Sequence, residues 1–267
     1  MEKKTIVLGG KLGYQAPASL VYRVPTTRLD GKAWRILLWM LWEAHARSRW
    51  RRVEEPQVEL EVRYHAQDML GGAGLIGEKG YRGLRVALEQ LQAVRFHGEP
   101  DPLILGFVER PGPHFDVVLS AAIAAEHARP LGRYALLNLE HIRRLRQPLD
   151  FAVYARACLV ARAREPRFHL RLDEIAWICG TKQDLAWRTL RRQILPAFTR
   201  VCAATGGRIV IQAWCEGDYH GIDHLLCHVG MAGDGFSPRF TPRRRAIFFD
   251  VGPTGAAPLA APSLVIG

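Results

Sequence analysis

Hydrophobic positions in the first half of the chain predict a long helix, a strand, a short helix, a second helix and a β-hairpin, in that order. Within the long helix, apolar residues return every three or four positions, which gives it one buried face, and Asp30 is placed to cap its start. The first strand alternates apolar and charged residues, which is the period of a half-buried strand. The predicted elements are helices over 29–48, 65–70 and 81–94 and strands over 58–62, 103–109 and 115–119.

The same order of elements is predicted a second time after residue 148. Gly180 is placed to end the second short helix in a left-handed conformation, and Thr181 with Asp184 forms a capping box that opens the following helix. Pro196 lies within that helix, where it predicts a bend at 194–195. The predicted elements are helices over 149–162 and 173–179, the helix opened by Thr181, and strands over 168–172 and 208–214.

This order of elements is that of a winged helix-turn-helix domain. Its repetition predicts an α+β protein with tandem winged helix-turn-helix domains and small antiparallel β-wings, although the two copies share the pattern rather than residue identity. The tail of the chain is basic and rich in Gly, Ala and Pro, which predicts partial disorder. The predicted organisation is an N-terminal arm over 1–28, a first winged-helix domain over 29–127, a second over 128–215 and the tail over 216–267.

Basic residues outnumber acidic ones. The 267 residues include 37 Lys and Arg against 26 Asp and Glu, a formal net charge of +11, and only six of the cations are lysine. Arginine suits phosphates and guanine edges, so nucleic acid is the leading partner class, ahead of an acidic membrane surface or a solvated basic surface without a partner. Thirteen cations and five acids lie between residues 141 and 200, which makes the second domain the main DNA-binding domain in this interpretation.

The helix opened by Thr181 carries its apolar and cationic residues on opposite sides, because residues three and four apart share a helix face. A helix fits the major groove of DNA, and Arg can bond bidentately to guanine there. An outward cationic face therefore predicts DNA contact, and the alternative is a solvated face of a core helix. The apolar residues are Trp187, Leu190 and Ile194, and the cations are Arg188, Arg191 and Arg192.

The number and spacing of the cysteines and the lengths of the apolar runs indicate the cellular compartment of the protein. Five widely spaced cysteines without a CxxC pair argue against a secreted disulfide framework and favour a reducing cytoplasm. Residues 1–10 lack the apolar core of a signal peptide, and the longest apolar run, over 36–42, is seven residues where a membrane helix needs about 20. We therefore expect a cytoplasmic protein without membrane attachment.

Scattered residues of both predicted domains match a known pattern. In the second domain they are Leu136-Leu137-Asn138, Pro148-Leu149, Tyr154, residues 172–175, Cys179-Gly180, Trp187-Arg188 and residues 194–197. In the first domain they are Gly80-Tyr81, Leu84, Leu88, Leu91 and Gln92, followed by the strand 116–119. With these residues the chain resembles plasmid replication initiators of the two-winged-helix, iteron-binding type, and is most similar to those of broad-host-range plasmids.

The resemblance implies a function and its partners. Such proteins bind repeated double-stranded sites at a plasmid origin, open an adjacent AT-rich stretch and help to load the host's replicative helicase, together with the host initiator; as homodimers they often repress their own gene. By this resemblance Arg188, Arg191 and Arg192 would contact bases or phosphates, and Lys79, Arg82 and Arg85 would contact phosphates. The predicted DNA-binding residues also include the start of the second helix, namely Thr181, Lys182 and Gln183.

Two further motifs suggest other chemistry. Residues 72–77 match GxGxxG, but a helical pattern precedes them where a dinucleotide fold needs a strand, so a turn between helices is the favoured interpretation. Two Cys and two His within 215–228 have the donor types of a tetrahedral zinc site, with spacing irregular for a known finger. These weak metal candidates are Cys215, His220, His224 and Cys227, and His224 and His228 would share a face if they were helical.

Three hypotheses follow. The first is a sequence-specific double-stranded DNA-binding protein that initiates plasmid replication, is not an enzyme and needs no cofactor. The second is a winged-helix transcriptional regulator without initiator activity. The third is a zinc-dependent nucleic-acid enzyme built on residues 215–228, although the sequence contains no paired carboxylates, no GxSxG turn and no His-apolar-His nicking motif.

Overall fold

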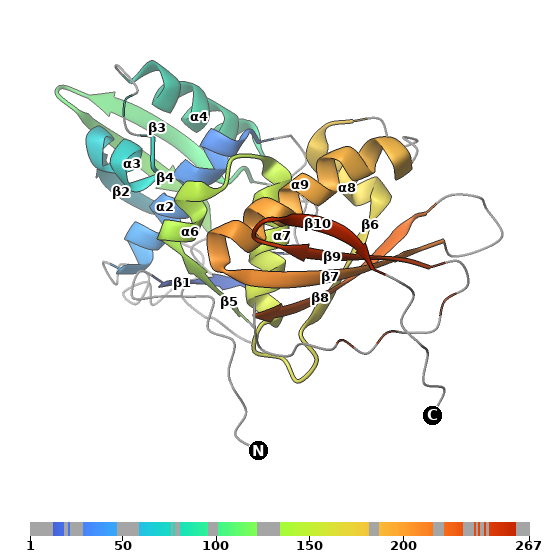
Figure 1. Cartoon of the computed structure of the whole chain (residues 1–267). Coiled ribbons are helices and arrows are strands. Elements are labelled where there is room, and N and C mark those ends of the chain that lie inside the picture. Colours follow the sequence, from blue (N-terminus) through green and yellow to red (C-terminus); the bar gives the residue numbers. More distant parts are fainter. Residues whose placement is uncertain are drawn as a thin grey trace. The chain divides into compact units, whose positions relative to one another are not determined.

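The computed structural model divides into two compact units, one within Gly9–Pro148 and the other within Leu149–Gly267, which are described separately here (Figure 1). The structure describes residues 13–18, 21, 29–46, 59–75, 77, 81–95, 101–121, 134–181, 187–215, 222–231, 238, 240, 243 and 246–259. Both units combine helices with antiparallel sheets, so the chain is an α+β protein. Among the described residues, no helix is both long and apolar enough to cross a membrane.

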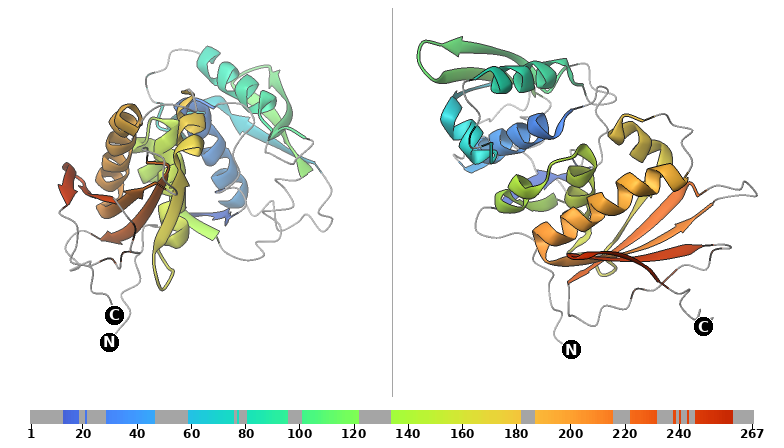
Figure 2. Two further views of the ribbon diagram at one scale, coloured as in Figure 1. Left: turned by 90° about the vertical axis from the view of Figure 1, so that its right-hand side faces the viewer. Right: turned by 45° about the horizontal axis from the view of Figure 1, so that its top comes forward.

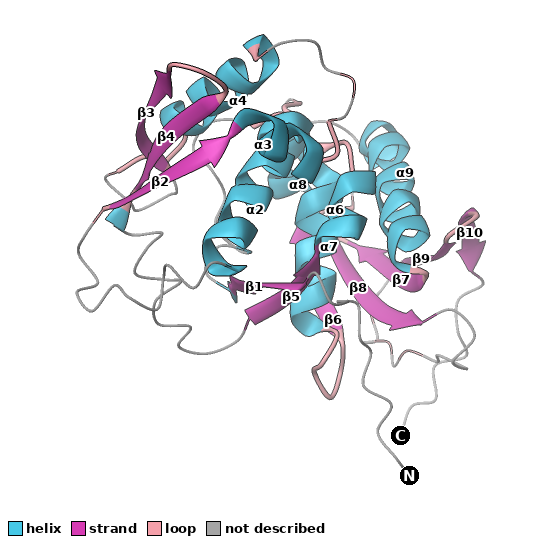
Figure 3. Ribbon diagram, turned by 90° about the vertical axis from the view of Figure 1, so that its left-hand side faces the viewer, coloured by secondary structure: helices cyan, strands magenta, loops and turns pink. Residues whose placement is uncertain are grey.

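The N-terminal unit packs helices against a three-stranded antiparallel sheet of order β2-β4-β3 and holds a second, two-stranded sheet of β1 and β5 (Figure 3). The side chain of Asp30 accepts a hydrogen bond from the Ala33 amide (Oδ1 to N, 2.7 Å), which confirms the predicted cap of the first long helix. The elements are β1 (Gly13–Pro17), α2 (Gly31–Ala46), β2 (Leu60–His65), α3 (Ala66–Gly72), α4 (Arg82–Ala93), β3 (Ile104–Arg110), β4 (His114–Leu119), β5 (Tyr134–Asn138) and α6 (Leu139–Arg144).

The C-terminal unit packs helices on a five-stranded antiparallel sheet of order β10-β9-β7-β8-β6, with α9 along one face (Figure 2). On that face the ring centroids of Trp187 and Phe249 are 6.1 Å apart, and the Cys202 thiol lies 3.4 Å from the Val251 carbonyl oxygen. The elements are α7 (Pro148–Val160), β6 (Arg167–Arg171), α8 (Leu172–Cys179), α9 (Trp187–Thr205), β7 (Gly207–Trp214), β8 (His224–Met231), β9 (Ile247–Gly252) and β10 (Gly255–Leu259).

One order of elements occurs in both units. Helix, strand, short helix, helix and two strands follow one another as α2-β2-α3-α4-β3-β4 and again as α7-β6-α8-α9-β7-β8. In both sheets the last of the three strands pairs between the other two, in the orders β2-β4-β3 and β6-β8-β7. The repeated order of elements is therefore present and the strand pairing repeats with it, although the last strand of the second copy, β8, lies in the segment predicted as tail.

The division between the units differs from the predicted boundary at residues 127 and 128. It lies at Pro148 because β5 pairs with β1 along its whole length and the segment after α6 lies against α2. A Cβ atom on Gly31 would stand 1.7 Å from the Arg146 carbonyl oxygen, so only glycine permits this close approach. The Arg143 Nε also donates to the Gly72 carbonyl at 2.9 Å, which ties α6 to the turn after α3.

The described residues of the segment predicted as a partly disordered tail, 216–267, include regular secondary structure. Three strands, β8, β9 and β10, lie within it, and β8 is hydrogen-bonded between β6 and β7. Leu225, Cys227 and Val229 of β8 are buried, and so is Phe249 of β9, because the helices cover this face of the sheet. The Gly-, Ala- and Pro-rich composition of this segment therefore did not predict its strands. β9 and β10 form because β7 and β9, respectively, supply their backbone hydrogen-bond partners.

The turn between α8 and α9 follows part of the prediction. Gly180 ends α8 with φ of +63°, a left-handed conformation that glycine adopts at no steric cost, as expected for the predicted C-cap. The Thr181 hydroxyl donates to the Ala176 carbonyl at 3.2 Å, whereas the amides that it would cap lie outside the described residues. Helix α9 continues through Pro196, which supplies no amide to the helical ladder.

Candidate nucleic-acid interface

Helix α9 has one buried and one exposed face, as predicted. Leu190 and Ile194 are fully buried, Trp187 is half-buried, and Arg188, Arg191 and Arg192 are exposed. The buried residues of α9 are Leu190, Ile194, Ala197, Phe198, Val201, Cys202 and Ala204. The apolar face attaches the helix to its unit, and the three arginines remain available to an external partner.

The three arginines of α9 differ in their surroundings. The Arg191 guanidinium carbon lies 6.0 Å from the centroid of the Phe249 ring, within the range of a cation–π contact. Within the part of the chain that the structure describes, Arg188 and Arg192 have no ion-pair partner, and no acidic residue lies on the exposed face of α9. Lys182 and Gln183, also predicted to bind DNA, lie outside the described residues.

Part of the positive charge between residues 141 and 200 is paired with acids. Five of its arginines form ion pairs with acids, and two of these pairs, those of Arg156 and Arg200, involve a buried side chain and join different elements. The pairs are Arg143 with Glu140, Arg156 with Glu174, Arg167 with Glu165, Arg171 with Asp173 and Arg200 with Asp150. Arg188, Arg191 and Arg192 of α9 are not among these pairs.

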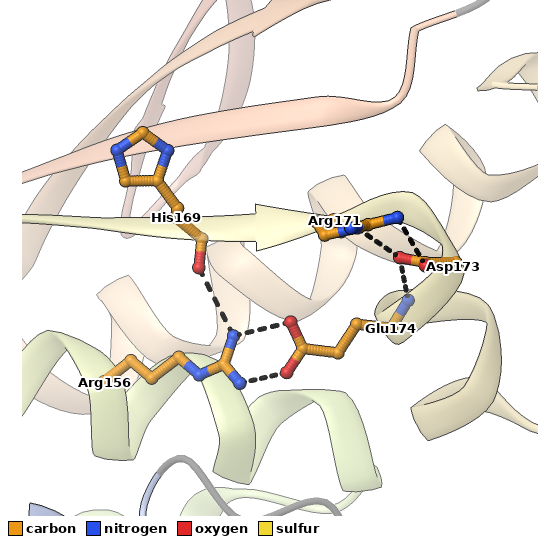
Figure 4. Close-up of polar contacts among 5 residues, drawn as sticks. All are labelled: Arg156, His169, Arg171, Asp173 and Glu174. Carbon is orange, nitrogen blue, oxygen red and sulfur yellow. Dashed lines mark hydrogen bonds and ion pairs between the residues drawn. The ribbon is translucent and has the colours of Figure 1, made fainter. Parts of the chain in front are cut away.

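A network around Arg156 joins α7, β6 and α8 (Figure 4). Arg156 of α7 is only 4% exposed; its two terminal nitrogens pair with the Glu174 carboxylate, and Nη1 also donates to the His169 carbonyl at 3.4 Å. Asp173 accepts from the Glu174 amide (2.8 Å) and from Arg171 Nε (3.1 Å). The network fixes the short helix α8, which precedes α9, against the strand and helix before it.

A second ion pair fixes α9 itself. Asp150 of α7 is fully buried, and its carboxylate accepts three hydrogen bonds from Arg200, with N to O distances of 2.8–3.0 Å. A buried carboxylate requires such a partner, because an unpaired buried charge is strongly destabilising. The pair therefore sets the orientation in which α9 presents its arginines.

Helix α4 occupies the equivalent position in the N-terminal unit. Its buried residues are the four predicted ones, Leu84, Ala87, Leu88 and Leu91. Arg82 and Arg85 are exposed, and Lys79 lies outside the described residues. Arg85 is paired with Glu109 of β3, and Val86 and Glu89 are exposed on the same side as Arg82. The outward face of α4 is therefore less cationic than that of α9.

The β3–β4 hairpin contains an ion-pair cluster that the sequence pattern does not reveal. Asp116 is buried in β4 and accepts hydrogen bonds from Arg63 of β2 (Nε to Oδ1, 2.6 Å) and Arg110 of β3 (Nε to Oδ2, 2.6 Å). These hydrogen bonds, that from Arg63 first, hold the pKa of Asp116 well below its usual range. Cross-strand register brings the three residues together, so only the pairing of β2, β4 and β3 could identify them.

The candidate zinc ligands do not form one site in the part of the chain that the structure describes. His224 and His228 lie on one face of strand β8 rather than on a helix, and Cys227 lies on the opposite face, because side chains alternate along a strand. Burial raises the pKa of the Cys227 thiol, whereas zinc binds the thiolate. His220 lies outside the described residues, and among those described no three His, Cys, Asp or Glu side chains are grouped to hold a metal.

The GxGxxG segment forms a turn after α3. Gly72 ends that helix, where a Cβ atom would stand 1.7 Å from Trp39 Nε1, and Gly74 has φ of +68°. The Gly74 carbonyl accepts from Arg35 Nη1 at 3.4 Å. The glycines permit close packing of this turn on α2.

Comparison with known proteins identifies a fold. No protein-family model matches the chain, and no curated protein matches its sequence. Among the solved structures that match is the crystal structure of Pi initiator protein in complex with iteron DNA, with a TM-score of 0.54 and 14% identity, covering 77% of this chain and 92% of that one. At this identity the likeness shows a shared fold, that of a plasmid initiator.

Proposed function

We propose that this protein is a sequence-specific double-stranded DNA-binding protein that initiates plasmid replication at origin repeats and represses its own gene. In this proposal both units are winged helix-turn-helix domains, α4 and α9 are their DNA-contacting helices, and the second unit supplies most of the binding. The protein acts in the cytoplasm, as a non-enzymatic initiator that recruits host replication proteins.

The observation that carries the proposal is the exposed arginine face of α9. A helix attached by its apolar side, following a short helix and a left-handed glycine turn, with Arg188 and Arg192 outward, has the chemistry of major-groove contact. The shared fold with a protein whose structure contains iteron DNA supports the same function. The buried ion pairs of Arg156 and Arg200 support it too, because they fix the elements that carry and precede α9.

Binding measured against salt concentration tests the DNA-binding part of the proposal. Purified full-length protein is first used to select a sequence from a duplex library with a random core of about 20 base pairs, near two helical turns. Binding to the selected duplex should weaken with salt, with a slope of about −0.9 for each phosphate neutralised. Failure to enrich any sequence, or binding insensitive to salt, would contradict the proposal.

Maintenance of a test plasmid separates an initiator from a transcriptional regulator. A plasmid lacking its own replication functions, and carrying direct repeats of the selected sequence beside an AT-rich segment, should be maintained only in cells that express the protein. Scrambled repeats of the same composition serve as the control. Repression of a reporter behind the repeats, without plasmid maintenance, would assign the protein to regulation alone.

A further inference from the structure

We infer that the three arginines of α9 have different roles in DNA recognition, an inference that rests on the proposed function. Arg188 and Arg192 read base edges and determine specificity, whereas Arg191 contacts the phosphate backbone from a position that Phe249 of β9 fixes. The sequence alone places the three side chains on one face and does not distinguish them.

The helical phase of the arginines is the first step. Arg188 and Arg192 are four residues apart and therefore lie along one line of the helix. This line is opposite the buried side on which Leu190, Ile194 and Ala197 lie. Side chains that point directly away from the protein body meet the floor of the groove into which the helix is inserted, where base edges are exposed.

Arg191 lies on a different line. It follows Trp187 by four residues, and Trp187 is half-buried, so Arg191 stands at the border between the buried and exposed sides. Both side chains contact the same ring, since Phe249 lies 6.1 Å from the Trp187 ring and 6.0 Å from the Arg191 guanidinium carbon. A side chain at this border faces the wall of the groove, where the phosphates lie.

The contact with Phe249 suits a phosphate ligand. A guanidinium over an aromatic face keeps its charge and its N–H donors, which an ion pair with a carboxylate would occupy. Ordering the side chain before DNA binds lowers the entropy cost of the contact. Phe249 is 4% exposed and belongs to a strand added beside β7, so the β9–β10 extension of the sheet supplies this positioning residue.

Lysine substitutions separate the two roles, because lysine retains the charge for a phosphate but lacks the planar fork that pairs with guanine. The full-length variants R188K, R191K and R192K are each used to select from the random duplex library. At least one of R188K and R192K should lose about 5- to 150-fold of its discrimination at one base pair. R191K should select the same sequence as the wild type, with the same discrimination.

Two further variants test the role of Phe249. R191A should weaken binding to the selected and to an unrelated duplex by the same factor and reduce the salt slope by about 0.9, as the loss of one phosphate contact requires. F249L should weaken both duplexes alike, and should have no further effect in R191A, because Phe249 acts through Arg191. Thermal unfolding of each variant identifies any that does not fold. If F249L does not fold, the three lysine variants still test which arginines determine specificity.

The outcomes keep the inference separate from the proposed function. Selection of no sequence by the wild type contradicts the proposed function itself. Selection by the wild type together with lost discrimination in R191K, or full discrimination in both R188K and R192K, overturns the division of work and leaves DNA binding intact. A weakening by F249L that persists undiminished in R191A overturns the positioning role of Phe249.

Discussion

Helices α4 and α9 hold the same place in the repeated order of elements, and their arginines recur at the same spacing. Arg82 and Arg85 in α4 correspond to Arg188 and Arg191 in α9, three residues apart and on either side of a buried leucine. The surroundings differ. Arg85 is held by the carboxylate of Glu109, and Arg191 by the ring of Phe249.

This difference determines what each helix can offer to DNA. The carboxylate cancels the charge of Arg85 and competes with a phosphate for its donors, whereas the aromatic ring leaves both the charge and the donors of Arg191 available. Four residues after the first arginine, α4 carries Val86 where α9 carries Arg192. Two helices in equivalent positions are thus unequal as DNA-contacting surfaces because of their neighbours as well as their own residues.

The largest expected effect comes from the ion pair that holds α9. Arg200→Ala leaves the fully buried Asp150 carboxylate without its arginine and should lower the free energy of unfolding by about 3 kcal/mol, as leaving a buried charge unpaired does. Urea unfolding of the full-length protein measures the change. Arg171→Ala is the matched control, because its pair with Asp173 is exposed and should be worth at most about 1 kcal/mol. Equal effects of the two substitutions would contradict the role given to Asp150.

The two units should also differ in their response to acid. Burial lowers the pKa of His228 in β8 to about 4, below the value of about 6.5 for an unfolded chain, so the unfolded state takes up a proton first. The stability that this gives is complete above pH 6.5 and is lost towards pH 4, by about 3 kcal/mol. Unfolding followed between pH 7 and pH 4 should show this loss in the wild type and a smaller one in His228→Leu.

The Asp116 cluster of the N-terminal unit responds to acid only at a lower pH. Because the pKa of Asp116 is lowered in the folded state, its contribution to the free energy of unfolding is complete above the pKa of an unfolded Asp, about 4. That contribution is lost only as the pH falls below this value. Asp116→Asn should therefore abolish a pH dependence found below pH 4 and leave that between pH 7 and pH 5 unchanged. A change in the higher range would contradict this assignment.

Alanine substitutions at equivalent positions compare the two helices as DNA-binding surfaces. Arg188→Ala should weaken binding to the selected duplex by about 1 to 3 kcal/mol, because it removes a base contact. Arg82→Ala, at the equivalent position of α4, should cost less than about 1 kcal/mol, the range of an exposed charge. Fluorescence anisotropy at one fixed salt concentration measures both. A larger loss from Arg82→Ala would reverse the assignment of the second unit as the main DNA-binding one.

The smallest expected effect concerns Glu109. Glu109→Gln removes the acid that holds Arg85 and should strengthen DNA binding by about 0.2 to 1 kcal/mol, the usual strength of an exposed ion pair. The salt slope should become steeper, since a further cation meets phosphate. Glu89→Gln is the control for the change in net charge, because Glu89 lies on the exposed side of α4, the helix of Arg85, and is not paired with Arg85. Weaker binding of Glu109→Gln would mean that Glu109 orients Arg85 for DNA.

The sequence predicted the helices other than α6 and five of the ten described strands, β2, β3, β4, β6 and β7, because their signals are local. Helix α4 has the four predicted buried residues, and Asp30 and Gly180 fill their predicted capping roles. It did not predict β9 and β10, whose residues are basic, broken by Pro or rich in Gly. Phe249 consequently had no predicted role, although it contacts both Trp187 and Arg191 of the candidate interface.

The sequence by itself determined the repeated order of elements and the arginine face of α9, since both depend on periodicities of 3.6 and 2 residues within single segments. Only the tertiary structure decided that Arg156 and Arg200 are neutralised, because their partners Glu174 and Asp150 are 18 and 50 positions away in the sequence. It also decided how the arginines of α4 and α9 differ. Glu109 and Phe249 reach them from neighbouring strands, and strand pairing is a long-range property that no local pattern encodes.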